Sequence, residues 1–315
     1  TLSNSLATTG KNKDGYNIKN NILYRHSFKT KDRILTLGFN TAFSKNNGAS
    51  DIYADYKFYD LNGSAPVDSL QQQYIDNRSN GVTLSGSITY NEPVGKKKRG
   101  QFQFEYNPSV QKNTADQKIL GYDGQSYTKY DSILSNQFEN KVITHNGGIT
   151  YRFNRSRDEQ LGINVNYQVT AFSSDRVSPH QNNTQYKFSN FLPYAYWRKK
   201  INKYCNIRAF YRSNISFPSV SQLQDVYNLG NPLNISTGNK ELKQSLTQYT
   251  GSRFSYTNTK TNKSIFANFF IQKSDDYISN ATFIAANDSA LENGVVLKKG
   301  SQLSKPMNLD HYWMF

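Results

Sequence analysis

Histidine, serine and cysteine are the residues whose spacing in this 315-residue chain could support catalysis or metal binding. The four histidines are scattered and form neither a helical i, i+4 pair nor a pair with cysteine; they are His26, His145, His180 and His311. A metal site or a nucleophilic Ser/His pair needs such groupings, and no Gly-x-Ser-x-Gly element occurs. The sequence therefore predicts no enzyme, no metal site and no cofactor.

A second group of side chains could bind a ligand without catalysing a reaction. The stretch 111–140 combines aromatic rings with carboxylates; the residues are Tyr122, Asp123, Tyr127, Tyr130 and Asp131. Rings and carboxylates together can stack on a sugar or contact a peptide. The alternative interpretation is the ordinary polarity of an exposed loop.

The elements that must position these residues are strands with one apolar and one polar face. In the stretch 81–106, Val82, Leu84, Ile88 and Tyr90 alternate with Thr and Ser, and after a charged turn at 91–100 the alternation resumes. Successive side chains on a strand point to opposite faces. Similar runs lie at 22–28, 35–43, 143–153, 161–171, 185–198, 203–213, 244–257 and 265–272.

The rhythm of the connections distinguishes a membrane barrel from a soluble sandwich. Most runs span about 9–13 residues, the length that a tilted strand needs to cross a bilayer. Short connections (29–33, 91–100, 154–160, 198–203, 257–263) alternate with long ones (45–80, 111–140, 173–184, 214–243, 274–306). Outer-membrane barrels have short periplasmic turns and long extracellular loops. Residues 52–58 alternate within a long loop, so we expect a strand extension above the membrane.

Composition agrees with a barrel and limits the other classes. The mean hydropathy is −0.75, and no apolar stretch reaches the roughly 18 residues of a transmembrane helix. The single Cys205 excludes an intramolecular disulfide. Of the net charge of +15, the five short turns carry +11, from 15 Lys/Arg and four Asp/Glu. This placement favours a solvated rim near outer-membrane lipid phosphates over a nucleic-acid site.

The loop that follows the strand 207–213 resembles a known family. It contains a Pro-Ser-x-x-Gln-Leu element, an Asn-Pro pair and a Gly-Asn-x-x-Leu element; the residues that carry the resemblance are Pro218, Gln222, Leu223, Asn231, Pro232, Gly238, Asn239 and Leu242. This is similar to TonB-dependent-receptor-like barrels, specifically the outer-membrane β-barrel family abundant in Bacteroidetes. Lys240 replaces the Pro that is usual there. Tyr90-Asn91-Glu92-Pro93 resembles the family's periplasmic turn, and Pro306-Met307-Asn308-Leu309 its strand entry. Pro, Gly and Asn suit a folded loop, so we expect the motif residues to fold this loop.

The predicted fold is all-β: a single antiparallel transmembrane β-barrel domain over residues 1–315, with roughly eleven crossing strands, the last around 310–315. Because closed bacterial barrels have even strand numbers, we expect a fragment of a larger barrel. The resemblance implies 22 strands, a plug and a periplasmic coupling segment, and neither of the last two is recognisable in this sequence.

The predicted function is outer-membrane transport of a nutrient by a Gram-negative bacterium, with loops 111–140 and 214–243 as capture surfaces. The partners that the resemblance implies are outer-membrane lipid, a periplasmic energy-coupling protein and a surface lipoprotein. Two alternatives remain: a barrel that serves as a scaffold or interaction subunit in a surface or secretion assembly, and a soluble all-β binding protein.

Overall fold

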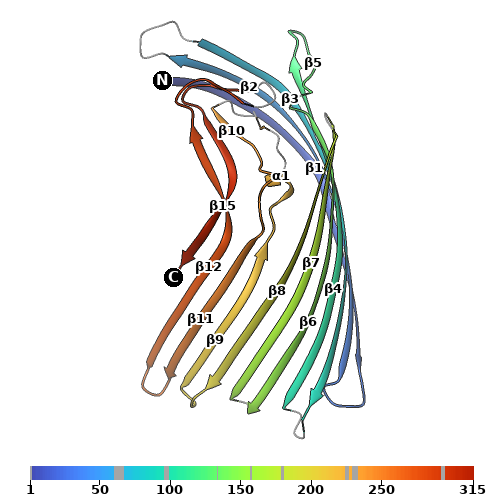
Figure 1. Ribbon diagram of the computed structural model, residues 1–315, viewed down its shortest axis with the longest axis vertical. Helices are drawn as coiled ribbons and strands as arrows, with labels where there is room; N and C mark the ends of the chain where they lie inside the picture. The colour runs from blue at the N-terminus through green and yellow to red at the C-terminus, as the bar shows by residue number, and fades with distance from the viewer. Residues whose placement is uncertain are drawn as a thin grey trace.

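The computed structural model describes residues 2–59, 67–95, 99–132, 134–156, 158–178, 181–223, 227–228, 233–291 and 295–315. Its main feature is one large curved sheet whose long strands pair antiparallel with their sequence neighbours (Figure 1). The long strands are β1 (Leu2–Ser27), β2 (Ile34–Tyr59), β3 (Val67–Val94), β4 (Gly100–Tyr122), β6 (Asn136–Ser156), β7 (Glu159–Ser178), β8 (Asn182–Lys200), β9 (Cys205–Ser216), β11 (Ser245–Asn258), β12 (Lys263–Ile284) and β15 (Gln302–Met314).

Several short strands and one helical turn lie toward one end of this sheet. β5 (Tyr127–Tyr130) pairs with β4, and β10 (Asn234–Ser236) adds to β15 in parallel. β13 (Ser289–Ala290) and β14 (Val296–Leu297) form a separate small hairpin. One helical turn, α1 (Val220–Leu223), occurs in the described part of the chain, within the fold that the sequence predicts to be all-β. No helix among the described residues is long and apolar enough to span a membrane.

The pairing register separates an apolar from a polar face, as the alternating sequence predicts. Phe104 lies opposite Ile149, which lies opposite Val165, so one row of apolar side chains crosses three strands. These three side chains are 44%, 51% and 45% exposed. The neighbouring row belongs to the other face and is polar, with Thr150 opposite Asn164. An exposed apolar face on long strands fits lipid, and a polar face fits a hydrated lumen.

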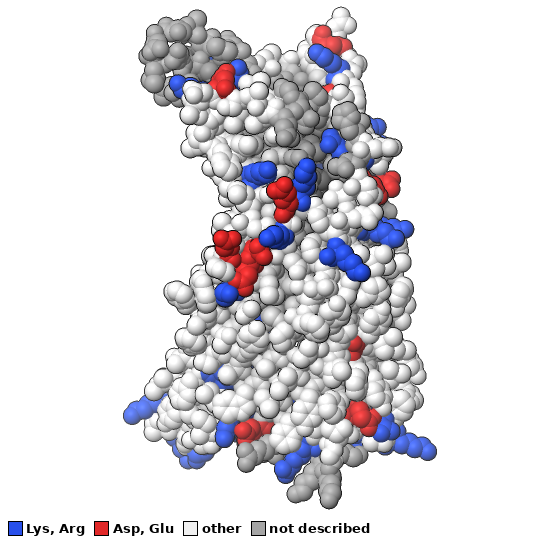
Figure 2. All heavy atoms as spheres, viewed as in Figure 1, with Lys and Arg blue, Asp and Glu red and all other residues white. Residues whose placement is uncertain are grey.

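The five short turns gather at one end of the sheet (Figure 1). Blue Lys and Arg atoms are prominent at that end in Figure 2. Within the Tyr90–Pro93 motif, Glu92 accepts hydrogen bonds from Arg33 Nε at 2.8 Å, from Arg33 Nη2 at 2.6 Å and from the Tyr90 hydroxyl at 2.6 Å. This motif therefore ties β3 to the β1–β2 turn.

Four of the five expected long loops are mostly strand, so the expectation of loops there is wrong, whereas the strand extension expected at 52–58 is confirmed. β2 and β3 extend through much of 45–80, β4, β5 and β6 through most of 111–140, β7 and β8 through most of 173–184, and β12–β15 through most of 274–306. The long strands consequently have 12 to 28 residues. Above the lipid both faces of an extension meet water, so backbone pairing continues while the apolar alternation that marks a strand in sequence disappears.

Candidate functional site

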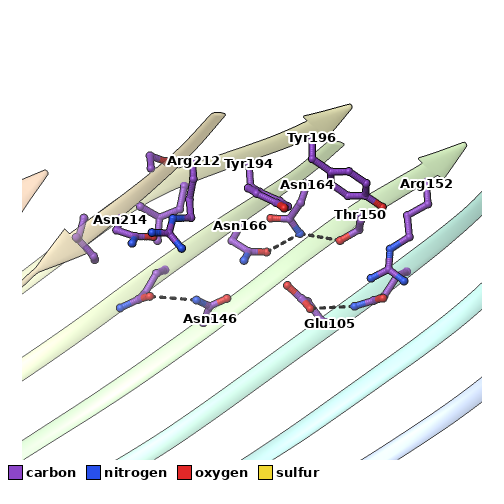
Figure 3. A pocket seen from close by; sticks show the side chains of 15 residues that line it. Glu105, Asn146, Thr150, Arg152, Asn164, Asn166, Tyr194, Tyr196, Arg212 and Asn214 are labelled. Carbon is purple, nitrogen blue, oxygen red and sulfur yellow. Dashed lines mark hydrogen bonds between the residues drawn. The ribbon is translucent and has the colours of Figure 1, made fainter. Parts of the chain in front are cut away.

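A polar hollow of about 630 Å³ lies on the inner face of the sheet (Figure 3). It draws on five adjacent strands, β4 and β6–β9. The lining residues are Gln103, Glu105, Asn146, Thr150, Arg152, Asn164, Asn166, Gln168, Leu192, Tyr194, Tyr196, Arg212, Ser213, Asn214 and Ile215. A volume of this size is typical of a small-molecule site.

Cross-strand register brings these side chains together. Asn164 Nδ2 donates to Thr150 Oγ1 at 2.7 Å and to Asn166 Oδ1 at 3.2 Å. Two glycines make the room: a methyl group at Gly148 would overlap Asn166 Oδ1, and one at Gly162 would overlap the Tyr196 ring. The Asn166 and Tyr196 side chains thus lie over glycines on the neighbouring strands.

Amides, hydroxyls and two cations set the chemistry of the hollow. Asn146 Nδ2 donates to Gln168 Oε1 at 3.0 Å, while Asn146 Oδ1 is buried and has no hydrogen-bond partner among the described residues. Arg152 and Arg212 outnumber Glu105, the one acidic residue in the lining. Such a surface can hydrogen-bond a polyhydroxylated or anionic solute. No cluster of three or more His, Cys, Asp or Glu that could hold a metal occurs in the described ranges.

The described residues of 217–244, called the inner segment below, fold onto the inner face of the sheet. Leu223 and Leu242, 7% and 2% exposed, form an apolar cluster with Phe172 of β7. Val142 of β6, Tyr186 of β8 and Ile278 of β12 pack against this cluster. Because β6 and β12 are five strands apart in the sheet order, the inner segment bridges the concave side of the curved sheet.

Polar contacts hold the inner segment at both ends. Ser219 and Gln222 cap α1 reciprocally: Gln222 N donates to Ser219 Oγ at 3.3 Å, and Ser219 N donates to Gln222 Oε1 at 2.9 Å. This is the capping-box arrangement. Asn239 Nδ2 donates to the Pro306 carbonyl at 3.0 Å, and Lys243 N donates to Asn308 Oδ1 at 2.8 Å.

The family-motif residues lie within this inner segment where they are described. Pro218, Leu223, Gly238 and Leu242 are buried. Asn231 and Pro232 lie outside the described residues. The motif residues that are described contact the inner segment itself or the sheet. Their role in folding this loop stays a prediction.

The predicted Tyr/Asp surface is a hairpin, away from the hollow. Tyr122 at the end of β4 and Tyr127 at the start of β5 have ring centroids 5.4 Å apart, and Tyr130 is 51% exposed. Asp123 closes the turn by accepting hydrogen bonds from the amides of Gln125 and Ser126 and from the Thr128 hydroxyl. Asp131 accepts from the Leu134 amide at 3.0 Å. Ligand binding by these five residues stays a prediction.

The hydrogen bonds to Asp123 predict that the stability of the β4–β5 turn depends on pH. The Thr128 hydroxyl and the two amides lower the pKa of Asp123 to about 2, against about 3.9 in an unfolded chain. A lowered folded pKa stabilises the turn above the unfolded value, and this contribution is lost as pH falls through about 2. We expect hydrogen exchange in 122–131, corrected for intrinsic rates, to accelerate between pH 4 and pH 2. Asp123→Asn should remove this pH dependence, and an unchanged pH profile in that variant would contradict the assignment.

The residues of the hollow were not singled out in the sequence. The polar strand faces predicted a hydrated lumen, but individual Asn, Thr and Tyr residues gave no signal. The cross-strand register, with Thr150 opposite Asn164 and Asn164 opposite Tyr194, is what collects them.

An antiparallel sheet with an apolar outer face, a polar inner face and short turns at one end defines a β-barrel of the outer membrane. Residues 26–313 match the sequence profile of the outer membrane protein beta-barrel family. The chain belongs to this family, and its location is the outer membrane. No curated protein matches the chain.

Solved structures of outer-membrane receptors are similar in fold. A double mutant of the Serratia marcescens hemophore receptor HasR, in complex with its hemophore HasA and heme, has a TM-score of 0.53 at 11% identity, covering 98% of this chain and 50% of that one. The ferric-catecholate import receptor Fiu of Escherichia coli has a TM-score of 0.45 at 9% identity (90% and 45% covered). The ferric yersiniabactin uptake receptor FyuA of Yersinia pestis has a TM-score of 0.47 at 10% identity, covering 87% of this chain and 46% of that one. The chain spans about half the length of these proteins, and the HasR likeness shows the fold.

Proposed function

We propose that this chain is the barrel portion of a TonB-dependent-receptor-like transporter that takes up a nutrient through the outer membrane. The observation that carries the proposal is the polar hollow beneath the inner segment. A packed barrel core would be apolar, whereas this hollow is lined by amides, hydroxyls and charged groups, which a passage for a hydrated solute accommodates.

The proposed mechanism has two stages. A solute is captured at the extracellular mouth, where the β4–β5 hairpin and the inner segment lie, and then passes along the amide-rich inner face. Energy comes from a periplasmic coupling protein, and a surface lipoprotein assists capture; both partners, like an origin in the Bacteroidetes, are inferred from the family resemblance.

Growth of a deletion strain tests this function. We expect loss of growth on at least one limiting nutrient from a panel of heme, ferric siderophores, oligosaccharides and peptides. Uptake of that nutrient should stop when an uncoupler collapses the proton gradient, because the proposed transport is energy-coupled. Complementation by the wild-type gene is the control. Identical growth of the deletion and parent strains on every source would contradict the proposal.

One observation favours the scaffold alternative. β2 and β3 have 26 and 28 residues, far more than the about 9–11 that a tilted strand needs to cross a bilayer, so they project well beyond the lipid. Such a projection is a surface on which a partner protein can assemble. If the deletion strain grows normally but a surface complex dissociates, the scaffold function is the correct one.

A further inference from the structure

Three arginines lie side by side on adjacent strands of the inner face. Arg198 of β8 lies directly opposite Arg208 of β9, and Arg208 lies directly opposite Arg253 of β11. Residues directly opposite in an antiparallel pair have Cα atoms about 4.5–5.5 Å apart. The row therefore places the Cα atoms of three arginines within about 9–11 Å, and we call it the arginine row.

Neighbouring contacts show which face the row occupies. Arg198 is two residues from Tyr196, and Arg208 is four residues from Arg212, and both of these neighbours line the polar hollow. Arg253 Cζ lies 5.9 Å from the centroid of the Phe266 ring. Side chains two or four residues apart on a strand share a face. Arg198, which the sequence analysis counted with the basic rim, thus belongs to the lumen.

Like charges directly opposite each other destabilise a sheet. No described acidic side chain forms an ion pair with any of the three arginines, and all three side chains are exposed. The register neighbours at the two ends of the row are Gln160 and Asn268, which are uncharged. Apart from the Phe266 ring near Arg253, no described side chain therefore offsets the repulsion, and an anion in the lumen would do so.

We propose that the arginine row is a binding site for an oligoanionic solute that carries phosphate, sulfate or carboxylate groups. Guanidinium groups bind such oxyanions in bidentate fashion. Arg152 and Arg212 extend the positive charge into the hollow, whose amides and tyrosines suit hydroxyl groups. The hollow, at about 630 Å³, admits a small-molecule solute. That the bound anion is the cargo rests on the proposed function; the binding itself does not.

The test is calorimetric binding of inositol hexakisphosphate to the full-length protein in uncharged detergent, with uncharged inositol as the matched probe. We expect wild type to bind the hexakisphosphate and not inositol. Hydrogen bonds to charged groups are strong enough that the R198Q/R208Q/R253Q variant should bind at least about tenfold more weakly. The R198K/R208K/R253K variant keeps the charge without the planar fork and should fall between the two.

A charge-matched control separates the row from net charge. The K29Q/K31Q/K260Q variant also removes three positive charges, but in the turns and away from the row, and should retain affinity within about twofold because salt screens distant charges. The proposal is overturned if wild type fails to bind the hexakisphosphate, as expected if an acidic protein surface occupies the row instead. It is also overturned if the R198Q/R208Q/R253Q variant and the Lys→Gln control lose affinity for the hexakisphosphate equally, or if neither of them loses it. Retained binding without uptake in the growth assay would refute the proposed function and leave the anion site standing.

Discussion

Replacing Val165 by arginine is expected to destabilise the barrel by about 2–4 kcal/mol, the cost of a charge on the lipid face near the bilayer midplane. Val165 lies in the middle of the apolar face of β7, opposite Ile149 on β6 and Pro193 on β8, and is 45% exposed. Equilibrium unfolding in urea from lipid vesicles measures the free energy directly. The midpoint should fall with an unchanged slope.

The adjacent position is the matched control. Asn166 lines the hollow on the inner face, so Asn166→Arg places the same charge in water and should cost only about 0.5–1.5 kcal/mol, the loss of the hydrogen bond that Asn166 accepts from Asn164. If one face meets lipid and the other meets water, the two variants must differ clearly in their free energy of unfolding. Equal costs at both positions would contradict the assignment of the two faces.

Replacing Leu242 by alanine is expected to release the inner segment. Leu242 is 2% exposed and packs with Leu223 and Phe172, and a buried Leu→Ala substitution costs about 2–5 kcal/mol. The loss falls on docking of the segment because the strands keep their backbone ladders. Trypsin cleavage after Lys240 or Lys243 should accelerate at least about thirtyfold, since cleavage follows the open population when opening is fast.

Leu84→Ala makes the same chemical change at an exposed position. Leu84 is 41% exposed on the apolar face of β3, so cleavage of the inner segment should be unchanged in this variant. If Leu242→Ala leaves the cleavage rate at its wild-type value while the barrel remains folded, the inner segment is held by contacts other than this cluster.

Apolar alternation made the membrane-level strands predictable. In the stretch 81–106 both alternating runs lie where β3 and β4 pair, with the short turn between them. The face of each residue also follows, because the period of a strand is two. Because one face of each strand meets lipid and the other meets water, apolar and polar residues must alternate along it.

The extensions and the inner segment left weaker signals. Residues 45–59 belong to β2, but beyond the lipid no face is required to be apolar. Inward folding of the inner segment depends on Phe172 and Ile278, which come from strands far apart in sequence. Ser219 and Gln222 have the spacing of a capping box, the one local sign of α1. The hollow and the arginine row arise from register, which no single strand reveals.

The central claim is that β7 has one face in lipid and one in water. Cys205 is the sole cysteine, so single cysteines can be introduced in a Cys205→Ser background at Ile163, Val165, Tyr167, Asn166 and Gln168. In outer-membrane vesicles, a lipid-partitioning maleimide should label the three odd-numbered positions and a charged, water-soluble one the two even-numbered positions. Odd-numbered positions that react with neither reagent, as in the core of a soluble sandwich, would contradict the account.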